Sequence, residues 1–275
     1  TVCNLIEIVA PERRGAGYTV AHLHCPFPDL APMVGFAKTV TIRARDAVSG
    51  SSYMQKRMDY LDYVGAAPQP SVVLIQDLDE PAGYGAFWGE VQTNVHKALG
   101  CLGTVTNGSV RDIPAVALDF QMLAGSVGPS HAYVHVVDFG IPVTIHGMST
   151  KSGDLIHADR HGAVIVPVDK IDPGQSVYDM GLDSLMGVEL VVALENRFGV
   201  RLPVMALNDN ATLDKLASRL IELLRHGETA PPDEVAGQVA QVAAQHAREE
   251  VPSEIVDALV ADMRAGPGSS KRMIT

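Results

Sequence analysis

Cysteine is scarce in this sequence and odd in number. The 275 residues include only Cys3, Cys25 and Cys101, which are too few for the disulfide framework that many small secreted domains need. The start Thr1-Val2-Cys3 also has none of the basic and apolar character of an export signal. We therefore expect a protein of a reducing compartment, the cytoplasm.

Long apolar runs and an excess of positive charge are also missing. No apolar stretch reaches the roughly 20 residues that cross a bilayer, although 47% of the residues are hydrophobic. The formal net charge of −11 disfavours general binding to nucleic acid or to an anionic membrane. We expect a globular protein with neither partner, in which a small anion can still bind at a local cationic site.

Common cofactor motifs are absent. Neither the glycine fingerprint of dinucleotide-binding domains nor the phosphate-binding P-loop occurs, and no second Cys/His pair completes a zinc site around His22-x-His24-Cys25. Four further histidines lie in two groups along predicted strands and turns, and we interpret them as core, rim or solvated residues rather than metal ligands. The first group is His131 with His135, and the second is His157 and His161 with Asp159 between them.

Residues 1–167 alternate between strand-like and helix-like patterns. Strands are predicted at 34–43, 71–76, 102–110, 132–137, 141–146, 155–159 and 163–167, and a helix at 89–99. The order strand, loop, helix, strand over 71–110 predicts a βαβ unit. Because the later strands have no helices between them, the pattern favours an α/β swivelling or sandwiched arrangement over a plain Rossmann sheet.

Charged residues follow the predicted strand 102–110 directly. Arg111 and Asp112 stand where the strand should leave the sheet, and ligands of α/β proteins usually bind at such ends. The pair alone is compatible with a structural ion pair and with a site for an anionic substrate and a metal. Its surroundings decide between the two.

The start of the helix predicted after Gly89 supports the functional interpretation. The free N–H groups of Glu90, Val91 and Gln92 would make a site for a carboxylate or phosphate. Glu90 precedes Arg111 by 21 residues, a distance that one βαβ crossover brings back together. A helix N-terminus, an acid, an arginine and an aspartate can therefore converge on a pocket for a small oxo acid and a divalent cation.

Two stretches carry a family resemblance. The segment from Gly89 to Gly108-Ser109-Val110-Arg111-Asp112 and the later 152–162 segment, Ser-Gly-Asp-Leu-Ile-His-Ala-Asp-Arg-His-Gly, resemble the RraA-like family over about residues 1–167. That family includes 4-hydroxy-4-methyl-2-oxoglutarate aldolases and oxaloacetate decarboxylases. It also includes proteins that regulate a ribonuclease by binding protein partners. The resemblance thus implies a lyase or, alternatively, a non-catalytic protein-binding regulator, in either case as a homo-trimer or higher oligomer.

The resemblance also implies roles for single residues. Arg111 would bind and polarise the oxo acid, Asp112 would bind Mg²⁺ or Mn²⁺, and the amides of Val91 and Gln92, beside Gly89, would receive the substrate carboxylate. Glu90 stands where the family aldolases have an acid that holds metal-bound water, one methylene longer than the usual aspartate. These residue types suit cleavage to a pyruvate enolate, because a hard cation on carboxylates and an arginine fork both stabilise a negative oxygen.

Over 168–225 the sequence pattern changes from mostly strand-like to helical. Helices are predicted from Leu185 to about Phe198, before Gly199, and from Thr212 onward. By pattern alone, Ser184 is a helix cap. A three-helix bundle without its longest helix would have little core of its own.

Gly181-Leu182-Asp183-Ser184-Leu185, with Met186, Glu189 and Arg201-Leu202-Pro203 after it, resembles the acyl carrier domains of modular polyketide synthases. By that resemblance Ser184 carries phosphopantetheine, and acidic residues near it would face polyketide synthase enzymes. The long first helix of such domains is missing. The tail, 226–275, begins with a linker and is predicted to form amphipathic helices at 233–249 and 253–263, followed by a disordered end.

Overall fold

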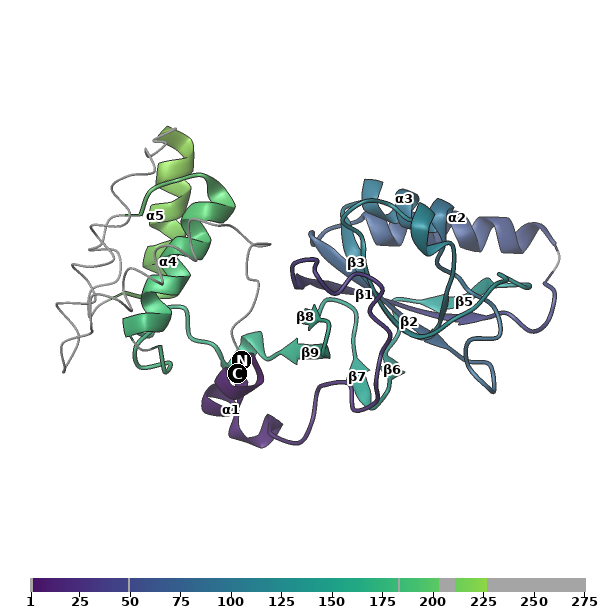
Figure 1. The fold of residues 1–275 in the computed structure, drawn as a ribbon, viewed down its shortest axis with the longest axis horizontal. Helices are drawn as coiled ribbons and strands as arrows, with labels where there is room; N and C mark the ends of the chain where they lie inside the picture. Colours follow the sequence, from purple (N-terminus) through teal and green to yellow (C-terminus); the bar gives the residue numbers. More distant parts are fainter. Residues whose placement is uncertain (1, 49, 183, 203–210, 227–275) are drawn as a thin grey trace, which may run out of the picture. The chain divides into compact units, whose positions relative to one another are not determined.

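The computed structural model describes residues 2–48, 50–182, 184–202 and 211–226 (Figure 1). The chain divides into two compact units, Thr1–Lys170 and Ile171–Thr275. The sequence-based boundaries at 167/168 and 225/226 stay a proposal. The helices predicted at 233–249 and 253–263 lie outside the described residues.

The first unit is built on a seven-stranded mixed sheet with the strand order β4-β3-β2-β1-β8-β9, and β5 also pairs with β1. Strands β1 to β4 run parallel to one another, whereas β5 and β8 pair antiparallel with β1, and β9 pairs antiparallel with β8. The strands are β1 (Met33–Arg43), β2 (Ser71–Asp77), β3 (Cys101–Val110), β4 (Gln121–Val127), β5 (His135–Phe139), β8 (Leu155–Asp159) and β9 (Gly162–Val166). A separate hairpin pairs β6 (Val143–Ile145) with β7 (Met148–Thr150).

Helices and the hairpin cover opposite faces of this sheet (Figure 1). Helices α2 (Ser51–Gly65) and α3 (Glu90–Ala98) lie on one face, and β6 and β7 lie on the other. The unit also contains α1 (Val2–Val9) and three short 3₁₀ turns, Pro11–Arg13, Ile113–Ala115 and Val168–Lys170. The unit therefore has three layers: the helices α2 and α3, the seven-stranded sheet, and the β6–β7 hairpin.

Strand β2 explains why the sheet supports two cores. Val73 and Ile75 pack into the helix-side cluster with Tyr60 and Trp88, while Val72 and Leu74 pack into the hairpin-side cluster. Successive side chains of a strand point to opposite faces, so the continuous apolar run 71–76 is buried on both. This is the burial expected for a sheet that is covered on both sides.

The predicted fold class is confirmed, and several element boundaries need correction. The βαβ unit is present as β2, α3 and β3, with β2 and β3 parallel. The strand predicted at 132–137 begins only at His135, because Ala132 has a left-handed backbone with φ 46°. Helix α2 and strand β4 were not expected, and α1 and β7 were also missed.

The second unit contains two described helices, α4 (Ser184–Phe198) and α5 (Leu213–His226). Helix α4 ends before Gly199, which has φ 64°, and the N–H of Lys215 bonds the Thr212 hydroxyl oxygen at 3.3 Å. Both helix ends match the sequence prediction. Within the described part of this unit, α4 is the first helix, so the α/β domain is followed by a small helical region without a long helix before Ser184.

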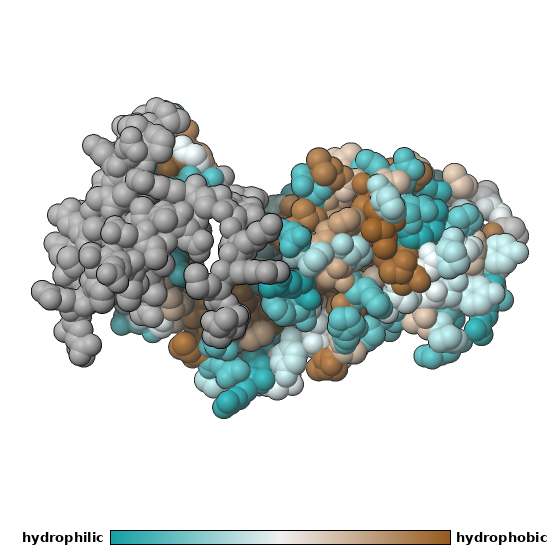
Figure 2. Space-filling model, viewed as in Figure 1, coloured by the Kyte–Doolittle hydropathy of each residue, from teal (hydrophilic) through white to brown (hydrophobic). Residues whose placement is uncertain are grey.

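None of the helices in the described residues combines the length and the apolar character that crossing a bilayer needs. Figure 2 shows apolar side chains in small groups between polar ones over the α/β unit.

Candidate functional site

The loop before α3 is fixed to the end of β3. Trp88 forms an isolated parallel bridge with Val110, and the N–H of Arg111 donates to the Trp88 carbonyl oxygen at 2.9 Å. This bond brings Gly89, the N-cap of α3, against Arg111 and Asp112. The start of α3 and the end of β3, which we expected from the sequence to converge, are therefore adjacent.

The backbone at Gly89 lies so close to Arg111 and Asp112 that there is no room for a side chain. A Cβ atom at this position would lie 2.8 Å from Asp112 Oδ2 and 3.3 Å from both Cγ and Cζ of Arg111. Since real Cβ atoms do not tolerate the first of these distances, a larger residue would displace the carboxylate. The backbone of Gly89 is extended, with φ −161°, so the constraint is steric and not conformational.

Arg111 and Asp112 form an ion pair between Arg111 Nη1 and Asp112 Oδ2. Their side chains are 29% and 38% exposed, respectively. Asp112 adopts a left-handed backbone conformation with φ 54°, an uncommon state for residues other than glycine. The Nε atom of Arg111 is buried and has no hydrogen-bond partner among the described residues. The Arg111 guanidinium is therefore paired through Nη1 and, within the described part of the chain, has a free hydrogen-bond donor at Nε.

The first turn of α3 presents free amides beside this pair. The first helical bond runs from the N–H of Thr93 to the Gly89 carbonyl oxygen at 3.0 Å, so the N–H groups of Glu90, Val91 and Gln92 precede the helix ladder. The side chain of Glu90 is exposed. Such a helix start favours an anionic ligand.

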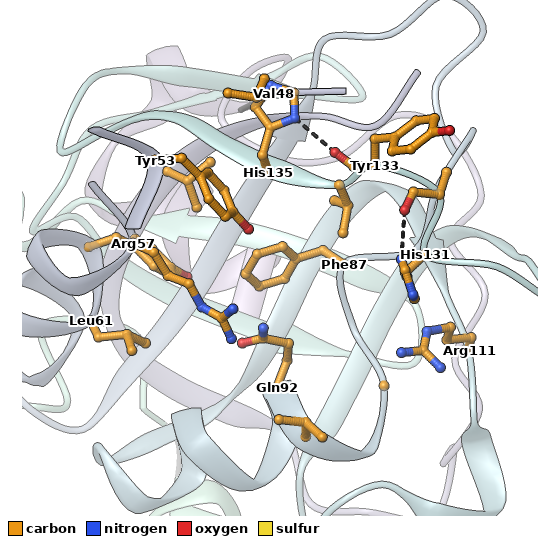
Figure 3. A pocket seen from close by; sticks show the side chains of 16 residues that line it. Val48, Tyr53, Arg57, Leu61, Phe87, Gln92, Arg111, His131, Tyr133 and His135 are labelled. Carbon is orange, nitrogen blue, oxygen red and sulfur yellow. Dashed lines mark hydrogen bonds between the residues drawn. The ribbon is translucent and has the colours of Figure 1, made fainter. Parts of the chain in front are cut away.

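A cavity of about 410 Å³ opens next to these groups (Figure 3). Four of the predicted site residues line it: Gly89, Val91, Gln92 and Arg111. Glu90 and Asp112 do not belong to its lining, although each adjoins a lining residue in the chain. The structure therefore brings the predicted substrate-binding residues together at one cavity and leaves the two predicted metal ligands beside it.

Sequence reasoning missed several lining residues. Arg57, Tyr53 and Tyr60 come from α2, a helix that was not predicted. A signal for α2 was present, because positions 53, 57, 60 and 64 follow helical spacing. However, the cation at Arg57 and the exposed Met54 and Met58 weaken its apolar stripe.

His131 and His135 also line the cavity. The carbonyl oxygen of Ala132 lies 2.6 Å from Nδ1 of His131, and that of Tyr133 lies 2.9 Å from Nδ1 of His135. Since a carbonyl oxygen only accepts, Nδ1 is the protonated nitrogen of each ring. The two rings are thus rim residues of the cavity that keep Nε2 as an acceptor when neutral.

A buried hydrogen-bond chain supports the cavity wall. Nδ1 of His96 donates to the Gln92 carbonyl oxygen at 2.7 Å, and the hydroxyl of Tyr60 donates to Nε2 of His96 at 2.8 Å. Burial lowers the pKa of His96 to about 4; the hydrogen bond to the Gln92 carbonyl oxygen opposes this shift, and the positive charge of Arg57 adds to it. The imidazole is therefore neutral near pH 7, and it connects α2 to the first turn of α3.

The donor set fits a hard divalent cation better than zinc. Among the described residues no three His, Cys, Asp or Glu side chains cluster as metal ligands. The acidic residues next to the contact between Gly89 and Arg111 are Asp112 and Glu90, the residue after Gly89. Mg²⁺ retains several waters and is commonly held by one or two carboxylates, whereas structural zinc needs four protein ligands. The residues present are thus compatible with Mg²⁺ or Mn²⁺.

The predicted phosphopantetheine attachment residue lies at the start of α4. Ser184 is the first residue of that helix, where a phosphodiester is favoured by the free helix amides. Asp183 lies outside the described residues. Val177 and Leu216 belong to the small core of this unit, against which Leu182 packs.

Comparison with known proteins identifies both parts of the chain. Residues 2–165 match the family model described as RraA-like: Aldolase/RraA. The chain belongs to the RraA-like family. Residues 164–220 match the model of the phosphopantetheine attachment site, so this RraA-like protein also carries a carrier-type segment.

Three curated relatives match parts of the chain. Protein DlpA of Legionella pneumophila is 24% identical over 115 residues, which are 40% of this chain and 18% of DlpA. A Halalkalibacterium halodurans protein, provisionally named a 4-hydroxy-4-methyl-2-oxoglutarate aldolase, is 30% identical over 84 residues, 30% of this chain and 40% of that protein. A phenolphthiocerol/phthiocerol polyketide synthase component of Mycobacterium tuberculosis is 37% identical over 79 residues, 29% of this chain and 4% of that protein. The chain thus spans less than half of each relative.

One solved structure supports the fold alone. It is described as novel cellulases from microbes associated with the gut ecosystem, with a TM-score of 0.51 and 20% identity. The alignment covers 70% of this chain and 81% of that chain.

Proposed function

We propose that the α/β unit is a divalent-metal-dependent lyase that cleaves small 2-oxo acids to a pyruvate enolate. The reaction is retro-aldol cleavage of substrates such as 4-hydroxy-4-methyl-2-oxoglutarate or decarboxylation of oxaloacetate. The observation that carries the proposal is the contact of Gly89 with Arg111 and Asp112, which puts a free helix start and a guanidinium at one cavity.

Each residue has a defined task in this proposal. The amides of Val91 and Gln92 receive the C1 carboxylate, because they are unpaired donors at the positive end of α3. The guanidinium of Arg111 donates to the C2 oxygen, where negative charge develops as the C3–C4 bond breaks. Its buried and unpartnered Nε supports this role.

Asp112 and Glu90 would hold Mg²⁺ or Mn²⁺ beside the C2 oxygen. A divalent cation there supplies stabilisation of the enolate charge. Gly89 keeps the Asp112 carboxylate close to Arg111, because any side chain at position 89 would collide with it.

The experiment is an assay of oxaloacetate and 4-hydroxy-4-methyl-2-oxoglutarate cleavage with Mg²⁺ and with a chelator. Arg111→Ala should lose at least about 100-fold in kcat/KM, the usual effect of removing one donor to a developing oxyanion. Arg160→Ala, at an exposed turn, is the matched control and should keep full activity. Activity that is independent of metal, or unchanged in Arg111→Ala, would contradict the proposal.

We also propose that Ser184 carries phosphopantetheine, so that the second unit holds acyl groups for polyketide synthase enzymes. The match of residues 164–220 and the position of Ser184 at a helix start support this role. Intact mass after incubation with coenzyme A and a phosphopantetheinyl transferase should increase by one phosphopantetheinyl group. The Ser184→Ala variant should not gain this mass, and an unmodified wild-type chain would refute the assignment.

A further inference from the structure

The cavity of the α/β unit contains a second arginine that the lyase proposal does not use. Arg57 projects from α2, and its guanidinium points toward the side chain of Gln92 (Figure 3). Arg111 lies on the opposite side, with Phe87 between them (Figure 3). None of the residues that line the cavity in the described part of the chain is acidic. The cavity is therefore cationic at two separate places.

The charge of Arg57 is not neutralised within the protein. Within the described ranges, no carboxylate forms an ion pair with it, and no hydrogen bond to its guanidinium is formed. The group is half-buried, and its charge reaches the interior, since it disfavours protonation of His96. A half-desolvated guanidinium without a partner attracts a carboxylate, with which it forms a charge-assisted pair.

We propose that Arg57 binds the second carboxylate of a dicarboxylic 2-oxo acid, and that it makes the site favour retro-aldol cleavage over decarboxylation. This inference rests on the proposed lyase function and specifies its substrate and its reaction. The first carboxylate and the C2 oxygen lie at α3 and Arg111, so the far carboxylate of an extended dianion points to the other side of the cavity. Leu61 and Phe87 line the cavity as well and offer apolar surface to a methyl group at C4.

The preference follows from the charge of the far carboxylate during each reaction. In retro-aldol cleavage, the C4 hydroxyl loses its proton, C4 becomes a carbonyl, and the C3–C4 electron pair forms the pyruvate enolate. The enolate then takes up one proton at C3, so no net proton is lost and two 2-oxo acids are produced. The far carboxylate stays on the departing product as an anion. Its pairing with Arg57 therefore persists through the transition state.

In decarboxylation, the far carboxylate itself is the leaving group. The bond between it and C3 breaks, its electron pair forms the pyruvate enolate, and neutral CO₂ departs; the enolate then takes up one proton from solvent at C3. The ion pair with Arg57 is given up as the bond breaks, so Arg57 stabilises the bound substrate more than the transition state. Binding that is stronger in the ground state slows the chemical step.

The test compares wild type with Arg57→Met, which keeps a flexible stem and removes the charge, and with Arg57→Lys, which keeps the charge. For 4-hydroxy-4-methyl-2-oxoglutarate, kcat/KM should fall about 10- to 100-fold in Arg57→Met, the range for losing one charged hydrogen-bonded partner, with partial recovery in Arg57→Lys. For oxaloacetate, KM should rise in Arg57→Met while kcat stays equal or increases. Arg45→Met, an exposed arginine stacked on Tyr84, is the control and should match wild type.

A binding measurement separates this inference from the lyase proposal. Calorimetric titration with 2-oxoglutarate, a dianion without the cleavable C4 hydroxyl, and with pyruvate, a monoanion, is carried out with Mg²⁺ present. Wild type should bind 2-oxoglutarate at least about 10-fold more tightly than pyruvate, and Arg57→Met should lose only this preference. A protein that shows the preference but cleaves neither substrate refutes the lyase function and the reaction preference, while Arg57 keeps its binding role. Equal binding of the two ligands by wild type, or an unchanged preference in Arg57→Met, overturns the role of Arg57.

Discussion

The buried imidazole of His96 should make the stability of the α/β unit depend on pH. Burial holds the pKa of His96 at about 4, compared with an ordinary value of 6.5. Below pH 6.5 the unfolded chain binds a proton at this residue, whereas the folded chain does not until the pH approaches 4. The free energy of unfolding must therefore decrease as the pH falls through this window.

The size of this effect follows from the pKa difference between the folded and unfolded states. Each tenfold change in proton concentration is worth about 1.4 kcal/mol for one proton, so His96 contributes about 3 kcal/mol at pH 7 that is mostly lost by pH 4.5. The main structural cause is burial, which deprives the charged imidazole of water. Protonation of Nε2 removes the lone pair that accepts from the Tyr60 hydroxyl and places a charge among apolar rings.

Denaturant unfolding followed by tryptophan fluorescence measures this contribution. Trp88 is the only tryptophan of the chain, is fully buried, and has its ring centroid 4.7 Å from that of His96, so its signal reports this unit. In His96→Gln the difference in unfolding free energy between pH 7 and pH 4.5 should be about 2.4 kcal/mol smaller than in wild type. The exposed His22→Gln is the control. If wild type and His96→Gln show the same pH dependence, His96 is not neutral in the folded state.

Four further predictions concern single positions. Gly89→Ala should abolish metal-dependent cleavage while far-ultraviolet circular dichroism stays native, whereas Gly15→Ala, with open space around it, should behave as wild type. Asp112→Asn should raise the Mg²⁺ concentration needed for half-maximal activity at least about 10-fold, and an unchanged metal titration would exclude this ligand. Gly103→Ala should yield little soluble protein, because its Cβ would lie 2.0 Å from a backbone oxygen of β4. Ser184→Ala should retain full lyase activity, since every residue that lines the cavity belongs to the first unit.

The sequence was most informative where local pattern and chemistry coincide. The continuous apolar run 71–76 predicted a strand buried on both faces, and Gly89 and Gly199 marked helix ends that the structure confirms. The convergence of Gly89 with Arg111 followed from the spacing of one βαβ crossover. These features depend on residues close to one another in the chain, so local sequence patterns are sufficient to predict them.

Other parts of the fold depend on contacts that no local pattern encodes. Strand β4 carries a glycine and polar residues at its end and is recognisable mainly through its pairing with β3. Helix α2 has a mixed surface, and only its packing against the sheet through Tyr60 and Val64 makes it an element. Because Arg57 belongs to α2, the second cation of the cavity could not be assigned before the helix was known.

The two arginines of the cavity belong to different structural elements, which affects how substrate preference can change among related proteins. Arg111 and the amides of α3 are built by a single βαβ unit, whereas Arg57 is contributed by a helix that precedes this unit in the chain. Substitutions in α2 can therefore exchange one distal group of a substrate for another without altering the geometry that stabilises the enolate. Related proteins that keep positions 89–112 and vary position 57 would share one bond-breaking chemistry while accepting different acids.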